Sequence, residues 1–269
     1  MSSVPREPHL SRFRELIRQG AGTLDIHDDQ DASSLYTSPT LAPERLVQRE
    51  VERVDLHLNS VCRLLCQAGI TARTVLDVGC GTGATTVALA LTRQLGAQQV
   101  IGIDPNRQSL EAANERWLAH RIDGPEVSFA PTAPGTPLPY DDRSFDLCVC
   151  VSVIEYLGQA AARREFAEEL LRVTRAGGTV CLITPNPFRL LDYHTHRLLG
   201  DFRRTSGYPW ASTPREIQQM FAPHPVRFLL GEQLSHGLTR RGVPLAPVAA
   251  KLSWLASLLP WQKGLVTRT

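Results

Sequence analysis

A glycine-rich stretch at residues 74–84, TVLDVGCGTGA, constrains the fold of this chain more than any other feature. An apolar run leads into three glycines at alternate positions, and a helix-forming sequence begins at Ala84. This order predicts a strand, a tight turn and a helix. Glycine suits such a turn because it adopts positive φ and lets the backbone approach a bound ligand closely. The turn is therefore predicted to bind a ligand, through Asp77, Gly79, Cys80, Gly81 and Gly83.

Two acids near this turn indicate the charge of the ligand. The glycines also match the G-x-G-x-x-G/A pattern of dinucleotide-binding turns, which place a pyrophosphate at the helix N-terminus. Asp77, two residues before the first glycine, would repel a pyrophosphate but attract an ammonium or a sulfonium. S-adenosylmethionine carries both of these cations and no phosphate, so it is favoured over a nicotinamide dinucleotide. Asp104 lies 21 residues after Gly83, near the offset of about 20 residues at which a carboxylate binds ribose hydroxyls in either cofactor class.

The rest of the chain alternates strand-like apolar runs with amphipathic helical runs. Such alternation predicts a doubly wound, mostly parallel α/β sheet that binds its ligand outside the carboxyl ends of the strands. Besides the first strand, strands are expected at residues 100–104, 126–130, 145–153, 179–184, 226–230 and 263–268. Helices are expected at residues 43–68, 85–95 and 159–174, with an Ala-Gly-Gly turn at 176–178, a short capped helix from Thr213 and an amphipathic segment at 244–261.

Domain organisation follows from the same pattern. Residues 1–70 are interpreted as an N-terminal helical arm or lid, and residues 71–269 as the cofactor-binding domain. A long insertion follows the fifth strand at about residues 186–212, where arginines alternate with aromatic residues. Connections of this length in compact domains are usually functional, so the insertion is expected to hold the pocket for a second substrate.

Composition excludes several classes of protein. A chain of 269 residues that is 42% hydrophobic can bury a full core, and its net charge of +2 with scattered basic residues disfavours nucleic-acid binding. No stretch reaches the length of about 20 apolar residues that spans a membrane, although peripheral contact with a membrane surface stays open. No signal peptide is recognised, and the cysteines in apolar runs indicate a reducing cytoplasm. The sequence carries no signal for an oligomeric state.

The six cysteines do not predict a disulfide framework. Cys148, Cys150 and Cys181 lie in strand-like runs, where they pack as small hydrophobic side chains. Cys62 and Cys66 are one helical turn apart, but a zinc site would need two further ligands that the sequence does not place. No acidic cluster suggests a divalent metal either, so no metal is expected.

Four sequence blocks occur in the order seen in a known family. They are VLDVGCGTG, IGIDPN, LPYDDRSFDLCVCVSVIEYL and LLRVTRAGGTVCLITPN, within about residues 71–186. The chain resembles the class I S-adenosylmethionine-dependent methyltransferases, especially those that act on small molecules. The resemblance implies a Rossmann-like sheet of seven strands whose last strand is antiparallel, and S-adenosylmethionine as the cofactor.

The resemblance also implies roles for individual residues. Asp104 would hold the ribose, Pro105 would pack on the adenine, and Cys150 and Val151 would line the methionine end of the cofactor. Relatives usually carry an acid and a small residue in the adenine loop, whereas this chain has PTAP from residue 131. A backbone group or Thr132 is expected to take over that contact.

Methyl transfer from a sulfonium needs few catalytic residues, because the cofactor carries the reactivity and the protein aligns the nucleophile. A hydroxyl acceptor benefits from a base, whereas an amine acceptor only has to be neutral. The candidates are His194, His196, Glu155 and Tyr156, and His196 is preferred. Tyr156 stands where the family often has a histidine.

The leading hypothesis is an enzyme that methylates an oxygen or nitrogen atom of a small molecule, such as a metabolite, a natural product or a lipid-like acceptor. One alternative is a methyltransferase that acts on RNA or protein. Another is a regulatory protein that binds the cofactor without turnover, which the altered adenine loop and the tyrosine at position 156 would suit.

Overall fold

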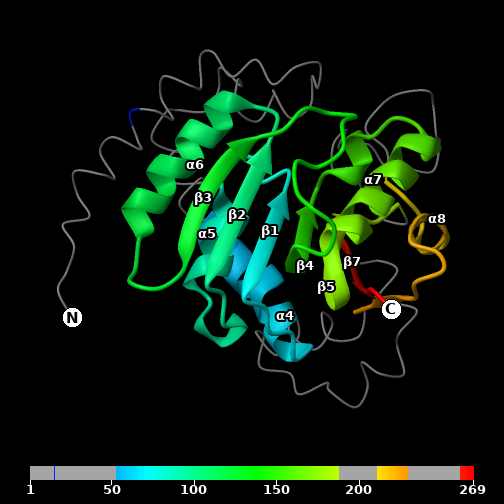
Figure 1. Ribbon diagram of the computed structural model, residues 1–269, viewed down its shortest axis with the longest axis horizontal. Coiled ribbons are helices and arrows are strands. Elements are labelled where there is room, and N and C mark those ends of the chain that lie inside the picture. The colour runs from blue at the N-terminus through cyan, green and yellow to red at the C-terminus, as the bar shows by residue number, and fades with distance from the viewer. Residues whose placement is uncertain (1–14, 16–52, 188–210, 230–260) are drawn as a thin grey trace. The chain divides into compact units, whose positions relative to one another are not determined.

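The computed structural model describes residue 15 and residues 53–187, 211–229 and 261–269. These residues form an α/β structure with a seven-stranded sheet in the order β3-β2-β1-β4-β5-β7-β6 (Figure 1). Neighbouring β1, β2 and β3 pair in parallel, whereas β7 pairs antiparallel with both β5 and β6. The predicted Rossmann-like fold, with its antiparallel last strand, is confirmed.

The bounds of the elements are as follows. The strands are β1 (Thr74–Val78), β2 (Gln99–Asp104), β3 (Glu126–Pro131), β4 (Phe145–Val151), β5 (Thr174–Pro185), β6 (Val226–Phe228) and β7 (Trp261–Thr267). The helices are α4 (Arg63–Gln67), α5 (Ala84–Leu91), α6 (Arg107–His120), α7 (Ala160–Val173) and α8 (Pro214–Met220). Short turns of other helix types are η1 (Leu58–Cys62, a π-helix), η2 (Arg93–Leu95) and η3 (Ile154–Tyr156).

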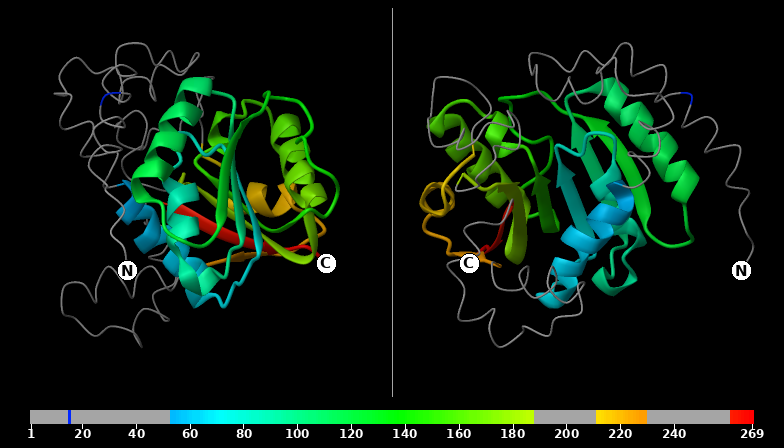
Figure 2. Two further views of the ribbon diagram at one scale, coloured as in Figure 1. Left: turned by 60° about the vertical axis from the view of Figure 1, so that its left-hand side comes forward. Right: turned by 180° about the vertical axis from the view of Figure 1, so that it is seen from behind.

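The chain divides into two compact units, residues 1–149 and 150–269. In the first unit, α5 packs against β2 and η1, and α6 packs against β3 (Figure 2). In the second unit, α7 packs against β5 and α8. The strands are apolar and buried because parallel strands of such sheets are covered on both faces; in β4, for example, Leu147, Cys148 and Val149 have no exposed surface.

Local sequence signals explain where two helices begin. The Asn106 side chain caps α6 by accepting a hydrogen bond from the Ser109 amide at 3.1 Å. Thr213 and Glu216 form a reciprocal capping box at the start of α8. Each pairing satisfies backbone N–H groups that have no partner within the helix. The cap at Thr213 was predicted from the sequence and is confirmed.

Three boundaries differ from the sequence prediction. The Ala-Gly-Gly segment is not a turn before the fifth strand, because β5 runs through it while the Gly177 amide donates to the Arg268 carbonyl at 2.8 Å. β4 ends at Val151 rather than at residue 153, since Ser152 takes a φ of 57°. The helix expected at residues 85–95 divides into α5 and η2 before Gly96.

Several predictions fall outside the described residues. These are most of the N-terminal arm, the body of the insertion at 188–210, and the amphipathic segment except Trp261. Within the described ranges, no helix is both long enough and apolar enough to cross a bilayer. The division into an arm at residues 1–70 and a domain at 71–269 stays a prediction.

Candidate cofactor site

The glycine turn is held against the carboxyl end of β2. Gly79, Gly81 and Gly83 have φ values of 72°, 51° and 76°, which residues other than glycine rarely adopt. The amides of Gly79 and Cys80 both donate to the Ile103 carbonyl, at 2.8 and 3.0 Å. The turn therefore forms where the sequence predicted it, between β1 and α5.

Two of these glycines are needed for different reasons. A Cβ at Gly83 would lie 2.7 Å from the Cβ of Ala113 in α6, so this position allows α6 to approach the turn. A Cβ at Gly81 would meet no atom within 4 Å. The outer side of Gly81 is thus open to a ligand, while Gly83 is required for packing.

Asp104, at the end of β2, fixes the turn from the side. Its Oδ2 accepts from the Gly81 amide at 2.8 Å, and its Oδ1 accepts from the Asn106 amide at 2.9 Å. Burial raises the pKa of this carboxyl, and the two amide hydrogen bonds act against that rise. A carboxylate has about four lone-pair sites, so Asp104 retains acceptor capacity for two ribose hydroxyls.

Asp77 is enclosed by the first turn of α5. Its side chain is 1% exposed, and its Oδ2 accepts a hydrogen bond of 2.6 Å from the Thr86 hydroxyl. Burial, together with the nearby Asp104 carboxylate, raises the pKa of this carboxyl to about 7, although the hydrogen bond from Thr86 acts against that rise. A cation bound at the turn would lower that pKa again, because an opposite charge favours the ionised form.

His57 was not identified by sequence reasoning. It lies directly before η1, is 9% exposed, and its Nδ1 is 3.0 Å from the Thr85 hydroxyl in the first turn of α5. This hydrogen bond ties the helix before β1 to the segment that follows the glycine turn. A lone histidine on an apolar helix face was the only sequence signal, and such a histidine usually has a structural role.

In the second unit, Glu155 is the buried acid that follows β4. It has no exposed surface, and its Oε2 accepts from the Thr184 hydroxyl of β5 at 3.2 Å. Burial raises the pKa of Glu155 to about 7, while the Arg163 guanidinium lowers it. Its Oε1 makes no hydrogen bond of good geometry to the described residues, although the Ser152 hydroxyl is near enough to lower the pKa slightly.

Two further buried side chains, Gln262 and Arg163, form hydrogen bonds with residues next to the long insertion. The Gln262 amide donates to the carbonyls of Ser212 at 2.7 Å and Pro185 at 3.3 Å, on either side of residues 188–210. The Arg163 guanidinium donates to the Ser212 hydroxyl at 2.6 Å and to the Leu157 carbonyl at 2.7 Å. These side-chain N–H groups are thus hydrogen-bonded, whereas Gln262 Oε1 has no hydrogen-bond partner among the described residues.

The remaining predicted site residues are spread over both units. Pro105 is exposed, and Thr132 is half-buried with its amide donating to the Asp104 carbonyl at 3.2 Å. Cys150 is fully buried, whereas Val151 and Tyr156 are half-buried. His194 and His196 lie outside the described residues. The structure thus brings the glycine turn and Asp104 together, and the roles of these other residues stay predictions.

The fold and the turn define a class of protein, namely a doubly wound α/β domain with an open glycine turn between two acids. This arrangement fits S-adenosylmethionine: Asp77 offers a negative charge to its cations, Asp104 offers acceptors to its ribose, and Gly81 leaves space. The comparison with known protein families supports this fit, because the methyltransferase domain family matches residues 75–178.

Curated relatives and solved structures were compared with the chain. It is 38% identical over 114 residues to an uncharacterized methyltransferase of Mycobacteroides abscessus, covering 42% of this chain and 40% of that protein. It is 30% identical over 185 residues to a Mycobacterium tuberculosis protein named a probable S-adenosylmethionine-dependent methyltransferase, covering 64% and 62%. It is 29% identical over 128 residues to the ajmaline N-methyltransferase of Rauvolfia serpentina, covering 48% and 38%.

Two solved structures share the fold. An S-adenosylmethionine-dependent methyltransferase from Aquifex aeolicus superimposes with a TM-score of 0.52 at 17% identity, covering 78% of this chain and 90% of that one. The YcgJ protein from Bacillus subtilis gives a TM-score of 0.50 at 18% identity, covering 80% and 99%. Over residues 75–178 this chain is similar to methyltransferase domains, and it has the fold of S-adenosylmethionine-dependent methyltransferases. It spans less than two thirds of the length of the three curated relatives.

Proposed function

We propose that this chain transfers the methyl group of S-adenosylmethionine to an oxygen or nitrogen atom of a small-molecule acceptor, with Glu155 as the base. One observation carries the proposal: a fully buried carboxyl, whose pKa burial raises to about 7, lies in η3, the short turn that follows β4. In doubly wound sheets, ligands bind outside the carboxyl ends of the strands. A base works best when its pKa lies near the working pH.

The surroundings of Glu155 suit the handling of a proton. Thr184 holds Oε2 by a hydrogen bond, which leaves Oε1 to accept a proton from a hydroxyl or an ammonium group. The positive charge of Arg163 stabilises the carboxylate that does so. Burial excludes water from this carboxyl and so strengthens both interactions.

The cofactor side of the reaction rests on the first unit. When bound, S-adenosylmethionine supplies an electrophilic methyl group, and the protein has to orient it. Asp77 and Asp104 would hold its cationic and ribose parts, with the amides and open face of the glycine turn between them. Pro105, Thr132, Cys150 and Val151 are proposed to complete the contacts with the adenine and the methionine.

Two facts favour a small molecule over RNA or protein as the acceptor. The net charge of +2 provides little attraction for a polyanion. The relative from Rauvolfia serpentina is named as an N-methyltransferase of ajmaline, a small molecule. We place the acceptor pocket at the insertion near residues 186–212, where Tyr156, His194 and His196 are the alternative bases, with residues 1–70 as a lid in a cytoplasmic enzyme.

The test is to incubate the protein with S-adenosylmethionine labelled on the methyl group and with fractionated metabolites of the source cells. We expect one small-molecule fraction to gain label, and the Asp104→Ala variant to gain less at limiting cofactor. Label that enters only RNA or protein would overturn the choice of acceptor. Cofactor binding without any labelled product would instead support a regulatory protein.

Once an acceptor is known, Glu155→Gln tests the base. We expect the rate to fall and its rise between pH 6 and 8 to disappear, while cofactor affinity stays unchanged. Glu165→Gln, on the exposed face of α7, is the matched control because it removes a carboxyl of the same kind away from this site. An unchanged pH profile in Glu155→Gln would exclude Glu155 as the base.

A further inference from the structure

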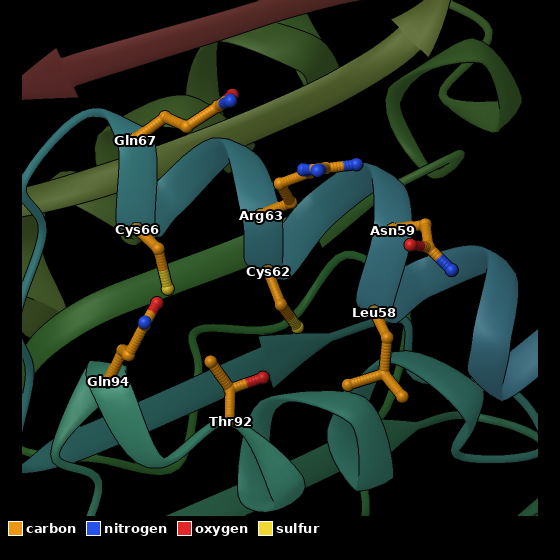
Figure 3. A pocket seen from close by; sticks show the side chains of 8 residues that line it. All are labelled: Leu58, Asn59, Cys62, Arg63, Cys66, Gln67, Thr92 and Gln94. Carbon is orange, nitrogen blue, oxygen red and sulfur yellow. The ribbon is translucent and has the colours of Figure 1, made fainter. Parts of the chain in front are cut away.

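The helix before β1 carries two thiols beside a pocket of about 450 Å³ (Figure 3). One wall consists of η1 and α4, and the other consists of Thr92 and Gln94. Figure 3 shows the side chain of Cys62 pointing toward Thr92 and that of Cys66 pointing toward Gln94. Both sulfurs therefore face the same pocket wall.

The pocket is separate from the cofactor turn. Thr92 caps the C-terminal end of α5, whereas the glycine turn precedes its N-terminal end. An eight-residue helix is roughly 12 Å long at the rise of an α-helix. A ligand in this pocket would therefore not compete with the cofactor for space.

The two thiols are close enough to share one ligand. Cys62 and Cys66 are four residues apart on one helical segment, and such residues have Cβ atoms about 5 to 6 Å apart on the same face. Cys66 also contributes electrostatically to the elevated pKa of Cys62, which places the two sulfurs within interaction range. Cys66 is half-buried and gives access from solvent, while Cys62 is buried behind it.

The protonation of the pair is defined by its neighbours. Burial raises the pKa of Cys62 to about 12 and raises that of Cys66. A hydrogen bond with the Thr92 side chain lowers the pKa of Cys62 and so opposes part of the effect of burial. Among the described residues, Asp77 of β1 raises the pKa of Cys62 electrostatically, and Arg63 lies on the same helix and lines the pocket.

Within the part of the chain that the structure describes, the two thiols lack the further ligands of a zinc site and fit a softer cation. Structural zinc takes four ligands, and the described residues contain no group of three His, Cys, Asp or Glu side chains that could hold a metal. Thiolates select soft ions such as Cu(I). Two sulfurs suffice for a linear centre of this kind.

We propose that Cys62 and Cys66 form a two-coordinate site for a soft monovalent cation of the Cu(I) class. Binding forms two metal–sulfur bonds and releases both thiol protons to solvent, so that Cu⁺ and two R–SH give Cu(SR)₂⁻ and two H⁺. No atom changes its oxidation state. Because the cation displaces two protons, its affinity rises with pH by about 100-fold per unit below the pKa values of the thiols.

The experiment titrates the full-length reduced protein with Cu(I) under nitrogen, in competition with a colorimetric Cu(I) chelator. Ag(I) serves as a second probe that does not undergo redox cycling. We expect one tightly bound ion per chain, and a loss of at least about 100-fold in affinity in either Cys62→Ser or Cys66→Ser. Gln94→Ala, which changes the same pocket but keeps both thiols, should bind as the natural protein does.

The double variant Cys62→Ser/Cys66→Ser measures any Cu(I) binding by the other four cysteines. Circular dichroism checks that each variant is folded. X-ray absorption on the unmodified protein needs no variant, and we expect two sulfur neighbours around copper. Equal binding by the double variant, dependence on only one of the two cysteines, or three or more protein ligands around the metal would each overturn the proposal. So would a mass loss of two hydrogens under these conditions, which would show a disulfide instead.

Discussion

Two buried carboxyls, Asp77 in the first unit and Glu155 in the second, have pKa values raised by burial to about 7, but they are built in different ways. Asp77 receives its hydrogen bond from Thr86, nine residues away, and its charged neighbour is another acid, Asp104. Glu155 receives its hydrogen bond from Thr184, 29 residues away, and its charged neighbour is Arg163.

This difference indicates what each carboxyl can do. Two acids close together repel each other, so the region around Asp77 and Asp104 gains stability when a cation arrives. A buried acid beside a guanidinium already has its counter-charge, so Glu155 can lose a proton without a ligand. The first region is therefore suited to bind a positively charged cofactor, and the second to exchange a proton.

The largest expected effect concerns the rigid turn of the first region. Gly83→Ala places a Cβ 2.7 Å from Ala113 at a φ of +76°, and overpacking together with backbone strain should lower the free energy of unfolding by about 2 to 5 kcal/mol. Gly96→Ala is the control, because its φ is +74° and nothing lies within 4 Å. It should cost only about 1 to 2 kcal/mol. Urea denaturation measures both, and equal losses would contradict the close packing of α6.

The pH dependence of stability compares the two carboxyls directly. In the folded protein both have a pKa of about 7, whereas in the unfolded chain they titrate near about 4. The folded state thus binds more protons between these values, so stability falls as the pH rises from about 4 to about 7, by about 3 kcal/mol for each group. Asp77→Asn should abolish the loss of stability that Asp77 causes, and Glu155→Gln should abolish the loss that Glu155 causes.

Saturating cofactor sharpens the same measurement. A bound cation should reduce the fall in stability with rising pH that Asp77 causes. The fall that Glu155 causes should stay unchanged. Thermal unfolding at a series of pH values, with and without S-adenosylmethionine, reads out both. If the cofactor altered the two parts equally, the assignment of the cation to the first region would be wrong.

Asp104→Ala tests the acid that fixes the glycine turn. Loss of charge-assisted hydrogen bonds should weaken the binding of S-adenosylmethionine by about 1 to 3 kcal/mol. Isothermal titration calorimetry measures the change, with Glu111→Ala on the exposed face of α6 as the control. An unaltered dissociation constant in Asp104→Ala would speak against the site.

The smallest expected effect is that of the link between His57 and Thr85. His57→Ala should destabilise the protein by about 1 kcal/mol, as for the loss of one buried hydrogen bond. A double-mutant cycle with Thr85→Val should show a coupling of about 0.5 to 1.5 kcal/mol. Strictly additive losses would mean that the 3.0 Å contact contributes nothing to stability.

Local signals explain how much could be predicted. Some features depend on residues at most a few positions apart, so their patterns are visible in the sequence. They are the strand before the glycine turn, the turn itself, and the caps at Asn106 and Thr213. The doubly wound sheet of seven strands with an antiparallel last strand was also predicted, from the alternation of strands and helices together with the family resemblance. The exact ends of β4 and β5 did not, because the backbone of Gly177 pairs with Arg268, far along the chain.

The sequence by itself determined the class of fold, the position of the glycine turn and the presence of Asp77 and Asp104 beside it, because these rest on periodicity and short spacing. Only the tertiary structure decided that His57 meets Thr85, that Gln262 joins Pro185 to Ser212, and that Glu155 is buried beside Arg163. The physical reason is that burial and the pKa shifts it causes depend on which distant segments pack together. No spacing rule along the chain records that information.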